Sequence, residues 1–173
     1  MVARWYGWAA ESVNRRASVN RRADSRRYTR IVSNCITCDV HAGRVHPAGG
    51  VIFDSELWQA EHGVDRLVRG YVVLKPKRHV HELADLDPAE SATLGPALQP
   101  LLRAMRSALD AERVYVCSFA ETVHHLHFHL IPRYADMPAL GPNLLQDLFA
   151  ERWVCSIAEA EDAAAQIRAG LAG

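Results

Sequence analysis

Three histidines alternate with large apolar residues at positions 125–129, which read HLHFH. Alternation with a period of two is typical of a half-buried β-strand, so this run predicts one face that carries three imidazoles and another that packs on a core. Neutral imidazole is a nucleophile, and its attack on phosphorus would divide a difficult displacement into two easier steps through a covalent intermediate. A neighbouring histidine can donate a hydrogen bond to a phosphate oxygen as charge builds there.

Two of the four cysteines, Cys35 and Cys38, stand at the Cys-x-x-Cys spacing of metal sites and redox pairs. A redox pair requires a helix that begins at the first cysteine, and none is evident after Cys35, so the spacing favours a metal. Two thiolates and two imidazoles would form a closed tetrahedral zinc site. Spacing alone leaves the imidazoles unassigned, because His41 and His46 lie nearest in sequence. It also leaves open a pair of loop cysteines without metal.

The composition is that of one soluble globular domain, with 173 residues, 49% of them hydrophobic and 23% charged. The apolar runs are only a few residues long, so no segment is expected to cross a bilayer. No apolar stretch follows the N-terminal residues, which argues against a secretory signal. We therefore expect a cytoplasmic protein with reduced thiols and no membrane partner.

The formal net charge of zero hides an asymmetry between the N-terminal segment and the rest of the chain. Residues 1–30 contain eight arginines against two acidic residues, so the remainder carries a balance of −6. This Arg-rich segment repeats the hexad SVNRRA in tandem and has no sustained apolar period, which predicts a disordered tail. The alternatives are an RNA-binding arm and an organelle presequence. Nucleic acid is expected as a partner only through this tail.

Short apolar runs predict strands on both sides of one long helix. Residues 51–53 and 57–60 flank a polar Asp-Ser-Glu segment and are expected to form a hairpin. Residues 71–74 predict a further strand that Pro76 ends, and residues 114–119 predict the strand before the histidine run. Strands separated by one long helix and joined by short links indicate an antiparallel sheet packed against helices.

Two capping boxes mark the helices. The sequence DPAE, which begins at Asp87, supplies an N-cap, a proline at the first helical position and a glutamate at the third, and leucines follow at helical spacing. Pro96 and Pro100 are expected to kink or split this helix. A second box at Ser156 begins an Ala-rich helix. Residues 35–50 contain several Gly and Pro breakers and predict a loop.

The basic run KPKRH at residues 75–79 precedes the histidine run, and the dipeptide PR at 132–133 follows it. With these motifs the chain resembles the histidine triad (HIT) family of nucleotide-binding hydrolases and transferases, and within it the zinc-containing, diadenosine polyphosphate hydrolase-like bacterial branch. The resemblance implies an α+β fold, a five-stranded antiparallel sheet with one long helix and a C-terminal helix, commonly as a homodimer. The expected regions are an Arg-rich tail at 1–30, a HIT domain at 31–150 and a C-terminal helical extension at 151–173.

The resemblance also implies roles for single residues. His127, the middle histidine, would attack the α-phosphate of a nucleotide conjugate and form a nucleotidyl-histidine intermediate, and His129 would contact the phosphate. The conjugate would be a dinucleoside polyphosphate, a nucleoside phosphoramidate or adenylyl sulfate. Glu121 and Thr122 stand where the family has Gln and then Ser or Thr as phosphate contacts. Thr122 fits, whereas the carboxylate of Glu121 would repel phosphate unless it is protonated, when it could act as a general acid.

In the zinc-containing branch the Cys-x-x-Cys pair binds a structural zinc together with two histidines, which correspond to His79 and His125. The implied ligand set is therefore Cys35, Cys38, His79 and His125. The ribose hydroxyls have no clean match, and Glu61 and His62 are the candidates for that contact.

Two other functions stay open at this point. The first is a nucleotide-binding module that is stabilised by zinc and has little turnover. The carboxylate of Glu121, which departs from the family pattern, favours this function. A metalloenzyme would use the three histidines of the run to hold a catalytic metal, because His-x-His residues can share one zinc ion.

Overall fold

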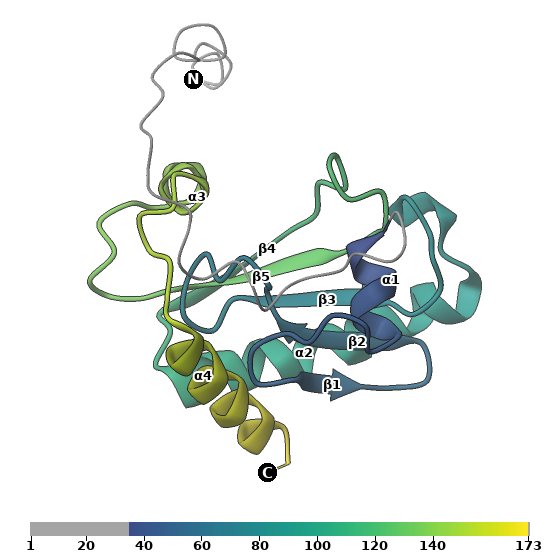
Figure 1. Cartoon of the computed structure of the whole chain (residues 1–173), viewed down its shortest axis with the longest axis horizontal. Helices are drawn as coiled ribbons and strands as arrows, with labels where there is room; N and C mark the ends of the chain where they lie inside the picture. Colours follow the sequence, from purple (N-terminus) through teal and green to yellow (C-terminus); the bar gives the residue numbers. More distant parts are fainter. Residues whose placement is uncertain (1–34, 173) are drawn as a thin grey trace, which may run out of the picture.

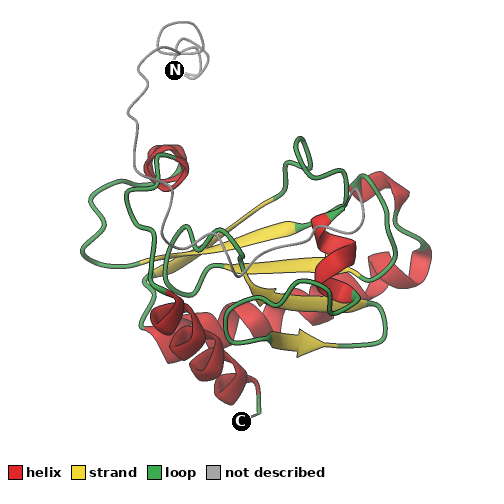
Figure 2. Ribbon diagram, viewed as in Figure 1, coloured by secondary structure: helices red, strands yellow, loops and turns green. Residues whose placement is uncertain are grey.

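The computed structural model describes residues 35–172, so the Arg-rich segment and its predicted disorder lie outside the described residues. Figures 1 and 2 show a single sheet with helices packed around it. No helix in the described part of the chain is long and apolar enough to span a membrane. The strands are β1 (Val51–Asp54), β2 (Trp58–His62), β3 (Val72–Pro76), β4 (Arg113–Cys117) and β5 (Phe128–Arg133). The helices are α1 (Ile36–His41), α2 (Pro88–Leu109), α3 (Pro142–Phe149) and α4 (Ile157–Leu171), with a 3₁₀ turn at Leu83–Asp85.

The five strands pair in the order β1-β2-β3-β5-β4, and every pairing is antiparallel. The predicted α+β fold with a five-stranded antiparallel sheet and one long helix is therefore confirmed. The register places Glu61 of β2 opposite Val73 of β3, and Val73 opposite His129 of β5. Because side chains of paired residues point to the same face, these three stand in one row across the sheet.

Helices α2 and α4 cover the face of the sheet that holds the main core. Trp58, Leu74 and Leu130 point into this core from the strands, and Leu101 of α2 and Ile167 of α4 meet them there. A second apolar cluster joins α3 to the sheet through residues that include Tyr71, Ile131, Leu144 and Leu148. The C-terminal helix α4, through Ile167, is part of the same main core as the strands.

The long helix α2 begins as predicted. The side chain of Asp87 accepts a hydrogen bond from the backbone N–H of Glu90, and the Glu90 carboxylate accepts one from the backbone N–H of Asp87. The predicted split is wrong, because one helix runs through Pro96 and Pro100 to Leu109. Both prolines lie on the exposed face. Water can therefore satisfy the backbone carbonyls that each proline leaves without a helical donor.

Two local predictions near the histidines need correction. Residues 35–50 are not all loop, since α1 begins directly after Cys35. Strand β5 begins only at Phe128, so His125 and His127 precede the strand. The alternation of buried and more exposed residues begins at Leu126 and includes His127, whereas His125 is buried like Leu126. Pro76 ends β3 and has no N–H with which to extend the hydrogen-bonded pairing of β3 with β5. The backbone N–H of Leu126 donates instead to the carbonyl oxygen of Val80, at 2.7 Å.

Replacing Leu101 by alanine is expected to lower the free energy of unfolding by about 2–5 kcal/mol, because its fully buried side chain would leave a cavity between α2 and the sheet. Urea unfolding followed by circular dichroism measures this change. The matched control is Leu83→Ala on the 3₁₀ turn, where the leucine is 56% exposed. Equal losses in the two variants would contradict this account of the core.

Candidate active site and metal centre

A pocket of about 370 Å³ lies on the face of the sheet opposite the main core, where α1 and the loop before β5 meet. It is lined by Ile36, Thr37, Val40, Glu61, Val64, Asp65, Tyr71, Val73, Phe119, Ala120, Glu121, Thr122, Val123, His127, His129 and Phe149. All four residues that the sequence predicted for catalysis and phosphate binding are among these. The structure thus brings His127, His129, Glu121 and Thr122 to one cavity.

His127 is half-buried, and one of its ring nitrogens is held by the backbone. Its Nδ1 lies 2.7 Å from the carbonyl oxygen of His125. Because a carbonyl can only accept, Nδ1 carries the hydrogen and donates it. The lone pair of the neutral ring is then on Nε2, on the opposite side of the imidazole from the backbone. A nitrogen lone pair held at the wall of a cavity is the feature that nucleophilic catalysis requires.

His129 is positioned by Tyr71. The Tyr71 hydroxyl lies 2.5 Å from Nδ1 of His129, and the two rings stack with their centroids 5.8 Å apart. Burial raises the pKa of Tyr71, so the phenol keeps its proton and donates it to Nδ1. Burial, with a smaller contribution from the charge of His127, lowers the pKa of His129 to about 4. A neutral His129 that accepts at Nδ1 carries its hydrogen on Nε2 and can donate it to an anion.

The rim of the pocket is more exposed than its floor. Glu121 and Thr122 lie on the exposed loop between β4 and β5. Phe119 and Phe149 are 48% and 53% exposed and meet at the rim with ring centroids 6.2 Å apart. These two aromatic residues and Tyr71 were not predicted as site residues, because an isolated aromatic residue in a sequence gives no sign of which cavity it will line.

His62 does not fulfil the expectation of a ribose contact. It is fully buried, its Nδ1 donates to the carbonyl of Gly63 at 3.1 Å, and its Nε2 accepts the N–H of Gly70 at 3.1 Å. Burial lowers the pKa of His62 to about 4. Both ring nitrogens are thus used inside the protein, whereas Glu61 on the same strand does line the pocket.

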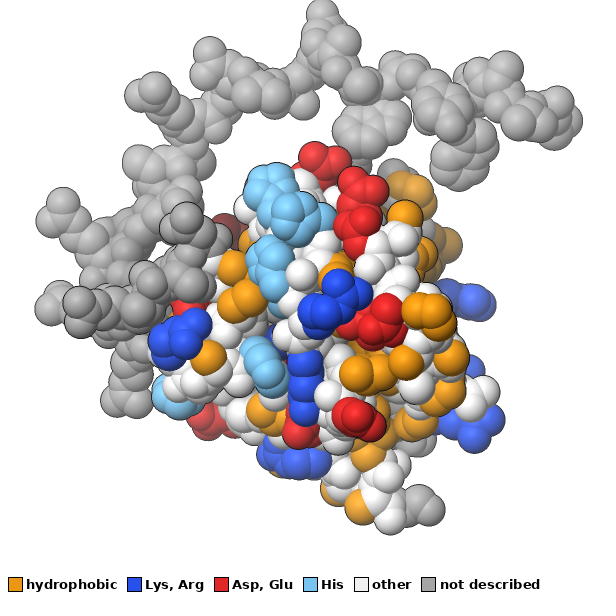
Figure 3. Space-filling view, turned by 90° about the vertical axis from the view of Figure 1, so that its right-hand side faces the viewer, with side chains coloured by type: hydrophobic (Ala, Val, Ile, Leu, Met, Phe, Trp, Pro, Cys, Tyr) orange, Lys and Arg blue, Asp and Glu red, His pale blue; other side chains and the backbone are white. Residues whose placement is uncertain are grey.

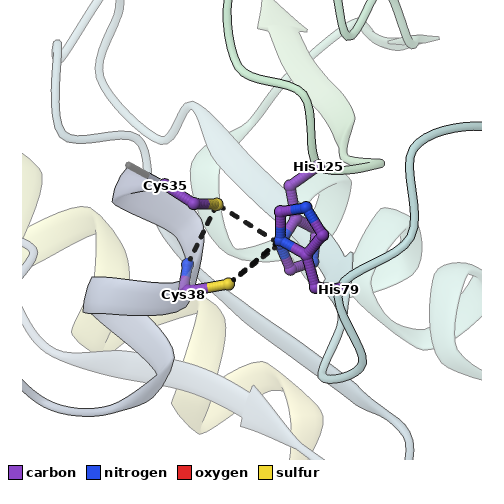
Figure 4. Close-up of side chains that lie close together, drawn as sticks. All are labelled: Cys35, Cys38, His79 and His125. Atoms are coloured by element: carbon purple, nitrogen blue, oxygen red, sulfur yellow. Dashed lines mark hydrogen bonds between the residues drawn. The ribbon is translucent and has the colours of Figure 1, made fainter. Parts of the chain in front are cut away.

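A second cluster lies beside the pocket and joins three separate segments of the chain. The sulfur atoms of Cys35 and Cys38 and one ring nitrogen each from His79 and His125 lie within 4.8 Å of one another (Figure 4). Nδ1 of His125 is 3.5 Å from both sulfurs, and Nδ1 of His79 is 3.2 Å from Cys38 Sγ. His41 and His46 are not part of this group. The four residues brought together are the four that the family resemblance implied.

Hydrogen bonds around the cluster orient its donor atoms. Nε2 of His125 donates to the carbonyl of Pro76 at 3.0 Å, which leaves the Nδ1 lone pair directed at the thiols. Burial lowers the pKa of His125 to about 4, so this ring is neutral as a metal ligand must be. The backbone N–H of Cys38 points to Cys35 Sγ at 3.5 Å, because Cys35 is the N-cap of α1. A helix therefore begins directly after Cys35, contrary to the expectation from the sequence.

The donor set fits a zinc ion. Two sulfurs and two imidazole nitrogens are the ligands of closed tetrahedral zinc sites. Burial and the neighbouring Cys35 raise the pKa of Cys38 to about 11, so two adjacent thiolates need a cation to stabilise them. Zinc would supply that charge, with Cys35, Cys38, His79 and His125 as its ligands.

The three histidines of the run are divided between the two clusters. His125 faces the cysteines, while His127 and His129 line the pocket with ring centroids 4.7 Å apart. Among the described residues, the group with three or more metal-ligating side chains in reach of one ion is the one that contains both cysteines. This geometry therefore does not support a catalytic metal held by the three histidines.

Histidine side chains also gather on one surface of the molecule, with acidic side chains next to them (Figure 3). Exposed rings continue outward from the metal-ligating group, because His79 contacts His81 with centroids 5.3 Å apart and His81 contacts His124 at 6.5 Å. His124 is exposed.

Comparison with known proteins gives a family and a fold. A model of the HIT domain family matches residues 48–136, slightly more than half of the chain. An uncharacterized HIT-like protein of Mycobacterium tuberculosis is 29% identical over 108 residues, which cover 57% of this chain and 70% of that protein. Two similar solved structures show the same fold. A Hit-like protein involved in cell-cycle regulation from Bartonella henselae has a TM-score of 0.64 and 24% identity, covering 79% of this chain and 96% of that one. A zinc-bound histidine triad family protein from Mycobacterium smegmatis has a TM-score of 0.60 and 23% identity, covering 80% and 93%.

Acidification is expected to destabilise the protein through its buried neutral histidines. The pKa of His62 is about 4 in the folded chain against 6.5 for the free side chain, so the unfolded chain binds more protons below pH 6.5. The free energy of unfolding should therefore fall between pH 6.5 and pH 4, by up to about 1.4 kcal/mol per pH unit for this residue. Urea unfolding at a series of pH values measures the slope. His62→Gln should be less stable at pH 7 and show a shallower slope, and an unchanged slope would contradict a neutral buried His62.

Proposed function

Because the chain belongs to the histidine triad (HIT) family, we propose that it hydrolyses or transfers nucleotide conjugates at their α-phosphate through a nucleotidyl intermediate on His127. The observation that carries this proposal is the orientation of one ring. Nδ1 of His127 donates to the backbone carbonyl of His125, which leaves the Nε2 lone pair at the pocket wall beside His129.

The proposed reaction has two displacements. In the first, Nε2 of His127 attacks the α-phosphorus, a P–N bond forms, and the bond from phosphorus to the leaving group breaks. The ring becomes cationic, and the carbonyl of His125 stabilises it through the Nδ1–H bond. In the second, the oxygen of water or of another acceptor attacks the phosphorus and its proton passes to solvent, the P–N bond breaks, and neutral His127 returns. The Nε2–H of His129 and the Thr122 hydroxyl, which both line the pocket, would donate to phosphate oxygens.

The candidate conjugates are those that the family resemblance implies: dinucleoside polyphosphates, nucleoside phosphoramidates and adenylyl sulfate. Each has an α-phosphate with a leaving group on the side away from the nucleoside. The mixed lining suits such a molecule, since apolar residues such as Ile36, Val40 and Val73 can contact a nucleoside. A homodimer remains a prediction of the same resemblance, and a cytoplasmic location remains a prediction from the composition of the sequence.

A second candidate is a nucleotide-binding module with little turnover, and the specific observation that favours it is Glu121. Its carboxylate stands at the pocket where the family places an amide, and a negative charge there repels phosphate. Glu121 is exposed, so its carboxylate can turn to water and reduce this repulsion. For that reason catalysis is the first proposal and the binding module the second.

We also propose that the Cys and His cluster holds a structural zinc ion. Its ligands come from the start of α1, from the segment after β3 and from the segment before β5. A metal bound there would tie these three segments together and fix the backbone of His125. Zinc would thus position the nucleophile without taking part in the displacement.

His127→Ala is expected to abolish the covalent intermediate and to lower turnover by about a thousandfold or more, because no other group in the pocket replaces the nucleophile. The protein is incubated briefly with an adenylyl phosphoramidate and analysed by mass spectrometry under neutral denaturing conditions, which preserve a P–N bond. The wild-type chain should gain one AMP group, and product should accumulate.

The matched control is His124→Ala, which removes an exposed histidine from the same run and should keep both adduct and turnover. Turnover that survives His127→Ala would contradict the nucleophile. Tight nucleotide binding without adduct or product in the wild-type chain would favour the binding module.

Cys38→Ser is expected to weaken zinc binding by at least about 100-fold and to lower the thermal midpoint, because the site loses one of its two thiolates. Native mass spectrometry and metal analysis should find one zinc per wild-type chain. His127→Ala should keep its zinc. Cys117→Ser is the control, since this half-buried thiol lies outside the cluster. Equal zinc content in Cys38→Ser and Cys117→Ser would overturn the ligand set.

A further inference from the structure

Glu61, which lines the pocket, belongs to a buried ion pair that the proposed chemistry does not use. Lys75 of β3 contacts Oε1 of Glu61 on β2, and the two side chains are only 1% and 5% exposed. Oε2 of Glu61 is also buried, and no group in the described part of the chain hydrogen-bonds to it. Burial raises the pKa of Glu61 and lowers that of Lys75, while their mutual attraction opposes both shifts. A residue that lines the pocket therefore carries a buried acceptor atom without a donor.

The position of this acceptor relative to the histidines follows from the strand register. Glu61, Val73 and His129 stand in one row on three adjacent strands, and all three line the pocket. Neighbouring strands lie about 4.8 Å apart, so the Cα atom of Glu61 is about 10 Å from that of His129. A nucleotide whose α-phosphate lies at His127 and His129 extends its ribose and base over a comparable length. A nucleotide that lies along this row would bring its base to the end of the pocket where Glu61 lies.

The chemistry of a carboxylate distinguishes the four common bases. An ionised carboxylate only accepts hydrogen bonds, and it can accept two from adjacent donors. The Watson–Crick edge of guanine offers such a pair, its N1–H and its 2-amino group. On adenine and cytosine the amino group is next to a ring nitrogen acceptor, and on uracil the N3–H lies between two carbonyls. A second carboxylate oxygen repels each of those acceptors.

We propose that Glu61, held in place by Lys75, is a specificity-determining residue that makes guanine nucleotides the preferred substrates of this pocket. This inference rests on the proposed nucleotide function and adds the identity of the base. The donors of guanine would satisfy the buried Oε2, and a base without them leaves that atom unpaired, which a site selects against strongly.

Equilibrium binding of nucleoside monophosphates to the zinc-loaded wild-type protein tests this selectivity without requiring turnover. Isothermal titration calorimetry with GMP, IMP, AMP and UMP should give affinities in the order GMP, then IMP, then the other two. GMP should bind at least about tenfold more tightly than AMP, and IMP falls between them because it keeps N1–H and lacks the 2-amino group. Deoxy-GMP should bind like GMP.

Glu61→Gln should reduce the affinity for GMP about tenfold or more and leave that for AMP within about threefold. The double variant Glu61→Gln with Lys75→Met gives the same readout without a buried unpaired ammonium group. Glu90→Gln is the matched control, because Glu90 is another buried carboxylate in an ion pair, with Arg78, and lies outside the pocket. It should lose stability and keep the GMP preference, and zinc content with thermal unfolding reports the fold of each variant.

The outcomes separate this inference from the function on which it rests. Equal affinity for all four bases would overturn the role of Glu61 and leave the nucleotide site in place. A preference for ribose over deoxyribose that disappears in Glu61→Gln, without a base preference, would assign Glu61 to the sugar hydroxyls and overturn the guanine assignment. Wild-type protein that binds none of the nucleotides would overturn the proposed function itself.

Discussion

The hydrogen bond from Nδ1 of His127 to the backbone carbonyl of His125 links the two clusters that give this fold its chemistry. The side chain of His125 belongs to the Cys and His group, and its backbone holds the ring that faces the pocket. Its Nε2 is fixed in turn by the carbonyl of Pro76 at the end of β3. A displacement of His125 therefore changes both the donor set around the thiols and the direction of the His127 lone pair.

The two faces of the sheet differ in the side chains that they carry. One face is apolar and packs on α2 and α4, which gives the strands a fixed register. The other face carries the polar row with Glu61 and His129, together with Lys75 and Tyr71. Such buried polar groups are costly unless each has a partner, and most of them here do. One exception, Oε2 of Glu61, belongs to a residue that lines the pocket.

Much of this arrangement is predictable from sequence periodicity and capping. The alternation around His127 gave the correct side for His127 and His129, and the capping boxes at Asp87 and Ser156 mark the true starts of α2 and α4. Alternation cannot tell which neighbour a side chain will meet, so it placed His125 in one cleft with the other two histidines. Only the family resemblance grouped His125 with the cysteines.

The remaining errors have physical causes of the same local kind. Helix α1 has six residues, too few for a hydrophobic period to appear in the sequence. The prolines of α2 do not break it because they lie on its solvent side. The partnership of Tyr71 with His129 joins residues 58 positions apart, and no local pattern encodes a contact of that range.

The strand order has a consequence for how the molecule forms. Cys35 and His125 are 90 positions apart in the chain. Strand β3 pairs with β5, and because α2 and β4 lie between these two strands in the sequence, β3 cannot pair until β5 has been synthesised. During synthesis the cysteines leave the ribosome long before their histidine partner. For that interval the two thiols lack the histidine neighbours that they have in the folded protein, and they are open to oxidants and to soft metal ions. Neither cluster can exist in a nascent chain that stops before β5. The late closure of the sheet therefore decides when both clusters form, and folding speed sets how long the two thiols stay unprotected.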